Sequence, residues 1–248
     1  MKMIRHAIHK SFRTFGYQLT RARGLGFDPL HDMRQFLPQV DSPVIFDVGA
    51  NQGQSVDSFR QVFPQATIHS FEPSPSTFQI LQQNCQSLPR VNTWNKGVGS
   101  REGVLPFIEN THSYMSSFLP PGETAWGEIA RTTDVPVITL DAFATQHKVD
   151  YLHILKSDTQ GYDLEVFRGA TELMRDNRIG LIYFEIIFSQ MYHGMPGFDE
   201  TFRFLLDHDF QLVTFYRPHF QNDLVSWTDA LFINRKLYEQ RPAGISKR

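Results

Sequence analysis

The chain has a single cysteine, no long apolar run and almost no net charge, and each absence excludes a class of protein. Cys85 alone cannot form an internal disulfide framework or a cysteine-rich zinc site, and it fits a reduced compartment. No apolar run approaches the length of a membrane span, and the N-terminus lacks the continuous apolar segment of a secretory signal. A formal net charge of -2 argues against nucleic-acid binding through bulk electrostatics. We therefore expect a cytoplasmic protein without a nucleic-acid partner.

The composition is otherwise that of a globular protein with a sizeable core. The 248 residues are 41% hydrophobic and 20% charged, and the 22 phenylalanines are expected to pack inside. This length suits one large α/β domain, and we find no internal repeat or low-complexity linker. We predict a domain over residues 41–240, preceded by an extension over residues 1–40.

The start of that extension is basic. Residues 1–27 contain six lysines and arginines, and no acidic residue precedes Asp28. Apolar side chains recur there at helical spacing, which predicts a basic amphipathic helix that is interrupted or ends near Gly16. We favour a helix packed on the domain, and the alternative is a weak contact with an anionic membrane surface or an acidic partner.

From residue 44 onward, strand and helix patterns alternate. Near-continuous apolar strands are expected at residues 44–48, 67–71, 91–98, 151–156 and 179–187, and helices at 53–62, 75–86, 163–175 and 199–207. Two last strands, 211–216 and 227–234, lack a helix of crossover length between them, and residues 104–138 are less regular. The pattern predicts a doubly wound, mostly parallel, Rossmann-like sheet of seven strands with an antiparallel edge hairpin.

The run Val44–Gly53 is the most informative stretch. It is typical of a buried strand, a glycine turn and a helix start, which is how an α/β protein builds a nucleotide pocket. Gly49 and Gly53 stand where the backbone must turn sharply, and Asn51 tolerates the unusual angles. We predict that Asp47, Gly49, Asn51 and Gly53 bind a cofactor.

Asp47 narrows the choice of cofactor. Its carboxylate would repel a diphosphate, which prefers neutral backbone N–H groups, and the Gly-x-Gly-x-x-Gly spacing is absent. A ligand with an ammonium and a sulfonium, as in S-adenosylmethionine, would suit an anionic side chain.

Two further residues at strand ends complete the expected cofactor site. Glu72 follows the second strand, where an acidic side chain can accept hydrogen bonds from ribose hydroxyls. This fits NAD as well as S-adenosylmethionine and argues against NADP. Asn95 ends the third strand beside the expected adenine edge, although a plain turn asparagine explains it equally well.

Asp158 and Glu185 end the next two strands and should face the same crevice. Transfer to a hydroxyl needs a base, and Asp158 is our first choice, with Glu185 as its partner. The alternatives are that both carboxylates hold Mg²⁺, or that Asp158 only caps a helix. We predict no dedicated metal ligands, and Lys156 is a candidate ion-pair partner for either acid.

Four residues lie on segments that could cover the crevice. We predict a role in substrate selection for His112, Tyr114, Tyr192 and His193.

Several motifs together resemble the FkbM-type family of methyltransferases. The resemblance covers residues 44–216 and rests on DVGANQG at 47–53, FEP at 71–73, TLD at 139–141, KSDTQG at 156–161, GA at 169–170, FE at 184–185 and Y-x-G at 192–194. It implies a class I fold that uses S-adenosylmethionine and O-methylates a hydroxyl of a sugar, glycan or natural product. It also implies that Glu72 binds the ribose and that Asp158 lies near the point of transfer.

The chain departs from the family pattern around Asp158. Ser157 replaces a common isoleucine, and Gln160, Tyr162 and Asp163 stand within a stretch where the family often has Glu-Gly-Ala-Glu. Gln160 removes a carboxylate, and Tyr162 is expected to add bulk beside the site. Two other functions stay open, an NAD-dependent oxidoreductase and a non-catalytic nucleoside-binding protein.

Overall fold

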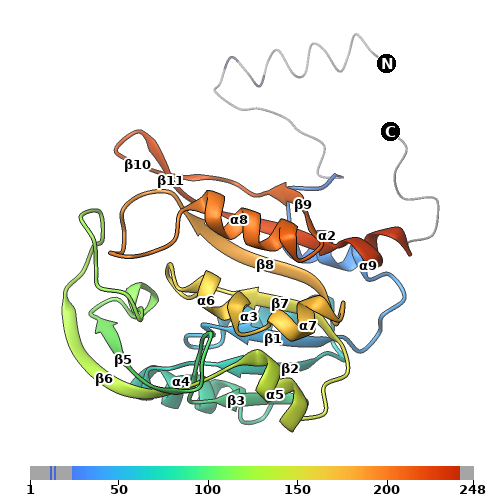
Figure 1. Ribbon diagram of the computed structural model, residues 1–248, viewed down its shortest axis with the longest axis horizontal. Helices are drawn as coiled ribbons and strands as arrows, with labels where there is room; N and C mark the ends of the chain where they lie inside the picture. The colour runs from blue at the N-terminus through green and yellow to red at the C-terminus, as the bar shows by residue number, and fades with distance from the viewer. Residues whose placement is uncertain (1–11, 13, 15–23, 241–248) are drawn as a thin grey trace.

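The computed structural model describes residues 12, 14 and 24–240, so the basic helix expected over residues 1–27 lies almost wholly outside the described residues. The described chain is built on an eight-stranded sheet in the order β10-β11-β8-β7-β1-β2-β3, with β9 also paired to β11 (Figure 1). The strands are β1 (Val44–Val48), β2 (Thr67–Phe71), β3 (Val91–Trp94), β7 (Leu152–Ser157), β8 (Ile179–Ile187), β9 (Phe210–Phe215), β10 (His219–Gln221) and β11 (Leu224–Asn234).

Five neighbouring strands, β3, β2, β1, β7 and β8, run parallel. Strand β11 is antiparallel to both β8 and β9, which confirms the expected mostly parallel sheet with an antiparallel edge. The sheet has one strand more than expected because the three-residue β10 also pairs with β11. All parallel strands therefore end at the same edge, where their following loops meet.

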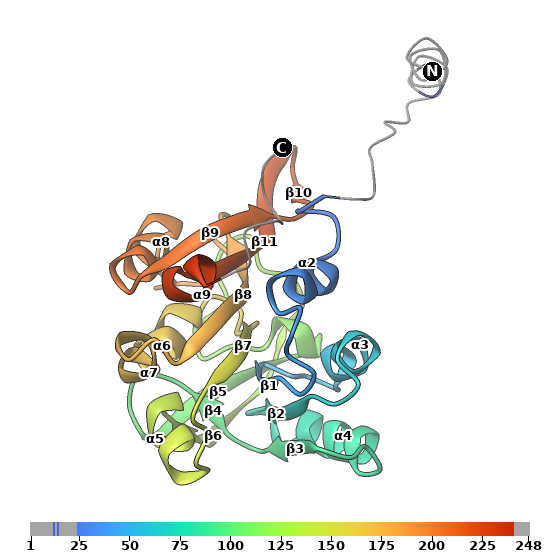
Figure 2. The same ribbon diagram turned by 90° about the vertical axis from the view of Figure 1, so that its right-hand side faces the viewer.

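Helices cover both faces of the sheet, with α2, α3 and α4 on one side and α5 to α8 on the other (Figure 2). Their bounds are α2 (Pro29–Phe36), α3 (Gln54–Val62), α4 (Pro75–Cys85), α5 (Leu140–Gln146), α6 (Asp163–Arg168), α7 (Thr171–Arg175), α8 (Phe198–Asp207) and α9 (Arg235–Glu239). The single helix expected at 163–175 is divided at Gly169, where a Cβ atom would lie 2.1 Å from the Gly99 carbonyl oxygen. No helix in the described part of the chain is long and apolar enough to cross a membrane.

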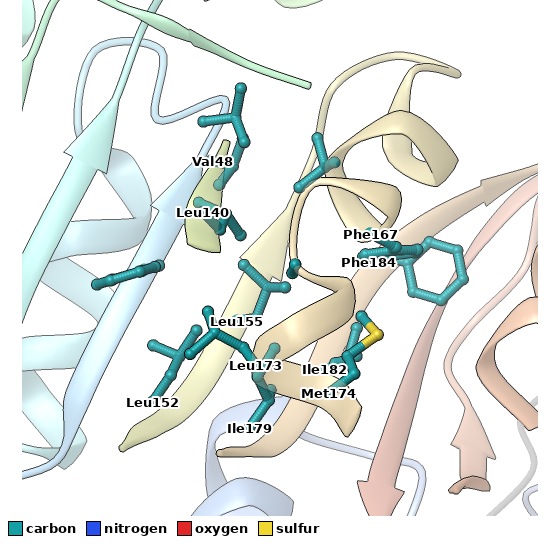
Figure 3. Close-up of a cluster of buried hydrophobic side chains, with 14 of the residues drawn as sticks. Val48, Leu140, Leu152, Leu155, Phe167, Leu173, Met174, Ile179, Ile182 and Phe184 are labelled. Atoms are coloured by element: carbon teal, nitrogen blue, oxygen red, sulfur yellow. The ribbon is translucent and has the colours of Figure 1, made fainter. Parts of the chain in front are cut away.

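Two apolar clusters hold the layers together. The first lies between the sheet and α5–α8, and Figure 3 shows Leu155, Phe167 and Phe184 within it. Burying one such side chain stabilises the fold by roughly 1.5–3 kcal/mol. The second cluster includes Met33 from α2, so part of the expected extension packs into the core. The boundary near residue 40 stays a prediction.

The segment expected to be irregular forms a second, three-stranded sheet of β4 (Gly97–Val98), β6 (Ile129–Ile138) and β5 (Gly103–Asn110). The expected third strand at 91–98 is therefore divided between the two sheets. A short 3-10 helix, η1 (Ser113–Met115), lies in the connection between β5 and β6. We call residues 99–138 the insert. Its two ends meet, because the Gly99 N–H donates to the Ile138 carbonyl at 3.0 Å.

Candidate active site

A cavity of about 260 Å³ lies at the carboxyl ends of the parallel strands, with the insert on its other side. Six of the residues singled out from the sequence line it: Gly49, Asn51, Glu72, Tyr114, Asp158 and Glu185. Six others do not: Asp47, Gly53, Asn95, His112, Tyr192 and His193. The predicted site residues are thus divided between the wall of the cavity and the structure behind it.

The glycine turn is pressed against the neighbouring strand ends. Gly49 has a φ of 74°, and a Cβ atom there would lie 1.9 Å from the Asp158 carbonyl oxygen. The N–H groups of Gly49 and Ala50 both donate to the Phe71 carbonyl at 3.0 Å. Asn51, with a φ of 48°, adopts the left-handed conformation expected of it. The turn therefore has little freedom to move.

Glu72 links the glycine turn to the loop before α4. Its Oε2 accepts from the Asn51 N–H and its Oε1 from the Ser74 N–H, both at 2.9 Å. Burial raises the pKa of Glu72 to about 7, and these two hydrogen bonds oppose the rise. Asn95 lies behind it and donates to the backbone carbonyls of Glu72 and Pro73. Since Asn95 does not line the cavity, the structure supports a role in holding this loop rather than the predicted adenine contact.

Asp47 is fully buried and does not reach the cavity. The Ser55 hydroxyl donates to its Oδ2 at 2.5 Å, and the Lys156 ammonium lies 3.1 Å from its Oδ1. Asp47 and Lys156 are register partners on β1 and β7, so their side chains point to the same face of the sheet. The expected direct contact with a cationic ligand is replaced by this internal ion pair.

Lys156 joins the two parts of the site. Its Nζ donates to the Gly49 carbonyl at 3.0 Å and lies 3.6 Å from Asp158 Oδ2. Burial favours the neutral amine, but the charges of Asp47 and Asp158 outweigh it and raise the pKa of Lys156 above its usual value. The charged lysine thus ties the glycine turn to the strand end that carries Asp158.

Gln160 bridges the two expected catalytic carboxyl groups. Its Nε2 donates to Asp158 Oδ1 at 3.1 Å and to Glu185 Oε2 at 2.8 Å. Its Oε1 accepts from the Tyr192 hydroxyl at 2.8 Å. The structure therefore brings Asp158 and Glu185 together, as their strand positions predicted. Gln160, which was noted as the loss of a carboxylate, thus supplies the N–H donor that two neighbouring carboxyl groups need.

The two acids differ in their surroundings. Burial raises the pKa of Glu185 well above its usual value, and the charges of Asp158 and Asp229 raise it further. The Asp158 side chain is 44% exposed and faces Lys156. Glu185 is therefore the acid whose protonated form burial favours, and Asp158 is the partly exposed acid that lies beside Lys156.

Ser157 and Tyr162, which depart from the family pattern, also contact other side chains. The Ser157 hydroxyl donates to Asp163 Oδ1 at 2.5 Å, and burial raises the pKa of Asp163 to about 6. The Tyr162 ring packs on Phe118 of the insert, with 4.9 Å between ring centroids. Tyr162 does not line the cavity, so the bulk expected beside the site supports the insert instead.

The residues expected to select the substrate occupy three different environments. Tyr114 lines the cavity, and the His112 ring stacks on it with 5.5 Å between centroids. Tyr192 lies behind the wall, where its hydroxyl also donates to the Met115 carbonyl at 3.1 Å. His193 lies outside the cavity on the loop after β8 and donates its backbone N–H to Pro120.

Two large aromatic residues of the wall were missed in the sequence. Trp126 of the insert and Trp227 of β11 both line the cavity. Nothing in the local pattern around either residue indicates this, because the insert and the sheet edge meet only in the folded chain. Within the described residues, no group of three or more His, Cys, Asp and Glu side chains could hold a metal ion.

One family model matches most of the chain, and the curated relatives are methyltransferases. Residues 47–212 match the family model described as the methyltransferase FkbM domain. The 2-O-methyltransferase NoeI of Sinorhizobium fredii is 24% identical over 163 residues, which cover 61% of this chain and 66% of that protein. The hexuronic acid methyltransferase AglP of Haloferax volcanii is 26% identical over 140 residues, which cover 54% and 53%. The chain thus spans about half to two thirds of these relatives.

Solved structures with a similar arrangement are distant in sequence. Fibrillarin, a pre-rRNA processing protein of Methanococcus jannaschii, is 13% identical and covers 86% of this chain and 71% of its own, with a TM-score of 0.49.

Proposed function

The chain belongs to the FkbM methyltransferase family, and from this premise we propose that it transfers a methyl group from S-adenosylmethionine to a hydroxyl of a sugar or sugar-like acceptor. The observation that carries the proposal is the juxtaposition of two sites in one cavity. The glycine turn and Glu72 form one wall, and the bridged carboxyl pair Asp158 and Glu185 forms another. The names of the two relatives, a 2-O-methyltransferase and a hexuronic acid methyltransferase, favour a sugar-like acceptor.

The residues present fit S-adenosylmethionine. Gly49 lets the turn pack directly against the Asp158 carbonyl at the wall of the cavity, and Glu72 offers carboxylate lone pairs to the cavity for a ribose diol. When bound, the cofactor supplies an electrophilic methyl group on a sulfonium.

The chain's own residues would then handle the proton. As the acceptor oxygen takes the methyl group, its proton passes to Asp158, which lines the cavity beside Lys156. Glu185, whose pKa is raised by burial, lies next to Asp158 and can donate a hydrogen bond to the acceptor. Gln160 and Tyr192 hold the two carboxyl groups in place, so that alignment supplies much of the rate.

An NAD-dependent oxidoreductase is disfavoured by the hydrogen bonds of the turn. A diphosphate needs free backbone N–H groups. Those of Gly49 and Ala50 are used by the Phe71 carbonyl, and that of Asn51 by Glu72. A non-catalytic nucleoside-binding protein would keep the turn but would not need Asp158.

Thermal unfolding with S-adenosylhomocysteine and with NAD tests the cofactor. A ligand that binds only the folded chain stabilises it by about 2.7 kcal/mol at a hundredfold excess over its dissociation constant. We expect a rise in melting temperature with S-adenosylhomocysteine and none with NAD. The reverse result would overturn the proposal.

A further inference from the structure

Two tryptophans form an aromatic wall at the acceptor end of the cavity. Trp126 comes from the insert and Trp227 from β11, and their ring centroids lie 5.7 Å apart at 47°. Both side chains are partly buried against a small, separate apolar cluster that contains Met115, Met191 and Tyr192. Neither indole N–H has a hydrogen-bond partner within the described part of the chain. This wall has no part in the chemistry assigned above.

The wall is held from behind. The His219 ring of β10 stacks on Trp227 with 4.8 Å between centroids and 1° between planes. Asn110 donates its side-chain amide to the Trp126 carbonyl at 3.2 Å, and Gln221 of β10 donates to Thr124 of the insert at 3.2 Å. The Trp227 ring is thus held by His219, and the backbone beside Trp126 is held by hydrogen bonds within the insert and to the sheet edge. Fixed aromatic surfaces lose little entropy on binding a ligand.

The wall stands next to the bridged acids. Trp227 faces Ile187 across β11 and β8, and Asp229, two residues along, faces Glu185. Two residues along a strand span about 7 Å, roughly the width of one hexose ring. The C–H face of a pyranose suits the negative face of an indole, while its hydroxyls can donate to carboxyl oxygens. A sugar ring against the wall can therefore present a hydroxyl to the acids.

The charges at this end favour an uncharged ring. Asp158, Glu185 and Asp229 lie there, and Lys156 is 10% exposed and already engaged by Asp47 and Asp158. The cationic side chain among the described residues lining the cavity is Lys96, just after β3. Because four strand spacings separate β3 from β8, Lys96 belongs to the β3 end of the cavity and Glu185 to the β8 end. A carboxylate on the acceptor would add a further acid to this cluster, whose lysine already contacts two carboxyl groups.

We propose that Trp126 and Trp227 form a binding subsite for a neutral pyranose ring and exclude the corresponding hexuronate. The inference rests on the proposed function, since the subsite is the acceptor end of that same cavity. It predicts a preference opposite to the one in the name of the hexuronic acid methyltransferase AglP.

Saturation-transfer NMR tests the subsite directly. The probes are the methyl pyranosides of glucose, galactose, mannose and fucose, and methyl glucuronoside, each added to the protein with and without S-adenosylhomocysteine. We expect signals from the ring protons of at least one neutral pyranoside and a signal for the glucuronoside that is weaker on the order of tenfold. Trp126→Leu and Trp227→Leu should each weaken the neutral signal on the order of tenfold, while leucine keeps apolar bulk in the cluster.

Trp94→Phe is the matched control. Trp94 packs on Phe143 and His147 outside the cavity, so its loss should leave both signals unchanged. The subsite is overturned if no neutral pyranoside gives a signal, if the glucuronoside binds equally well, or if the signal survives both leucine substitutions in folded protein.

Calorimetry with S-adenosylhomocysteine on the same samples separates the two proposals. Absence of cofactor binding together with a tryptophan-dependent pyranoside signal would overturn the proposed function and support the subsite. Normal cofactor binding in both leucine variants, with the pyranoside signal lost, supports both.

Discussion

The two halves of the cavity are built in different ways. The half around Gly49, Asn51 and Glu72 comes from two consecutive strand ends, and its contacts are mostly made by backbone N–H groups. The half around Asp158 and Glu185 is assembled from the ends of β7 and β8, the loop after β8, the insert and β11, and its contacts join side chains. The first half depends on backbone geometry, and the second depends on side chains drawn from several parts of the chain.

Lys156 is the bridge between these halves. It contacts the Gly49 carbonyl on one side and Asp158 on the other. Substitutions in the half around Gly49 and Glu72 should change cofactor affinity, and those in the half around Asp158 and Glu185 should change turnover. Lys156 contacts both halves.

Replacing Asp158, the proposed base, should have the largest effect. In Asp158→Asn, the acceptor proton loses its destination, so kcat should fall on the order of 10²–10⁴-fold. Steady-state methyl transfer with a saturating acceptor measures this, and calorimetry should show S-adenosylhomocysteine binding changed by less than about threefold. Turnover within about twofold of the wild type would mean that Asp158 is not the base.

Acidification should weaken cofactor binding through Glu72. Its pKa of about 7 means that lowering the pH through neutrality protonates the group proposed to accept the ribose hydroxyls. The dissociation constant of S-adenosylhomocysteine should therefore rise by up to about tenfold per pH unit below pH 7 and level off above it. Calorimetry between pH 6 and 8 measures the slope.

Glu72→Gln provides the control for that slope. The variant should bind more weakly and lose the pH dependence, with kcat at saturating cofactor changed little. An unchanged slope in Glu72→Gln would assign the titration to another group.

Gln160→Glu should have the smallest effect, confined to the acceptor half. The Gln160 hydrogen bond lowers the pKa of Glu185, so a third acid in its place raises the pKa values of the cluster. Because turnover requires an ionised base, the acid limb of the kcat profile should move to higher pH by about one unit. Gln146→Glu, on the exposed end of α5, is the matched charge control and should leave the profile in place.

Much of the cofactor half could be predicted because it is encoded by contiguous residues. Strands β1 and β2 match the predicted ranges, since a buried parallel strand leaves an uninterrupted apolar run. Glu72 lines the cavity, as predicted. Asp47 does not line it and is paired with Lys156 instead. A sequence shows that a carboxylate follows a strand, but not that a lysine on the next strand neutralises it.

The acceptor half could not be predicted to the same depth. Pro106 lies within β5 and Pro136 within β6, and proline is uncommon inside strands. The pairing of β5 with β6 was therefore not predicted. Gln160 looked like a lost carboxylate because its two acidic neighbours come together only across the sheet. Trp126 and Trp227 were not predicted to be neighbours either, because they are distant in the sequence and meet only in the folded chain.

The way in which the insert leaves and rejoins the sheet has an evolutionary consequence. Gly99 and Ile138 are hydrogen-bonded to each other, so the intervening chain departs from and returns to a single point. Segments anchored in this manner tolerate insertions and deletions, since their length does not alter the spacing of the strands that flank them. The insert can therefore change in length without moving the strand ends that carry Gly49 and Asp158, provided that Ser113 and Glu109 keep their hydrogen bonds to Asn51 and Ser74.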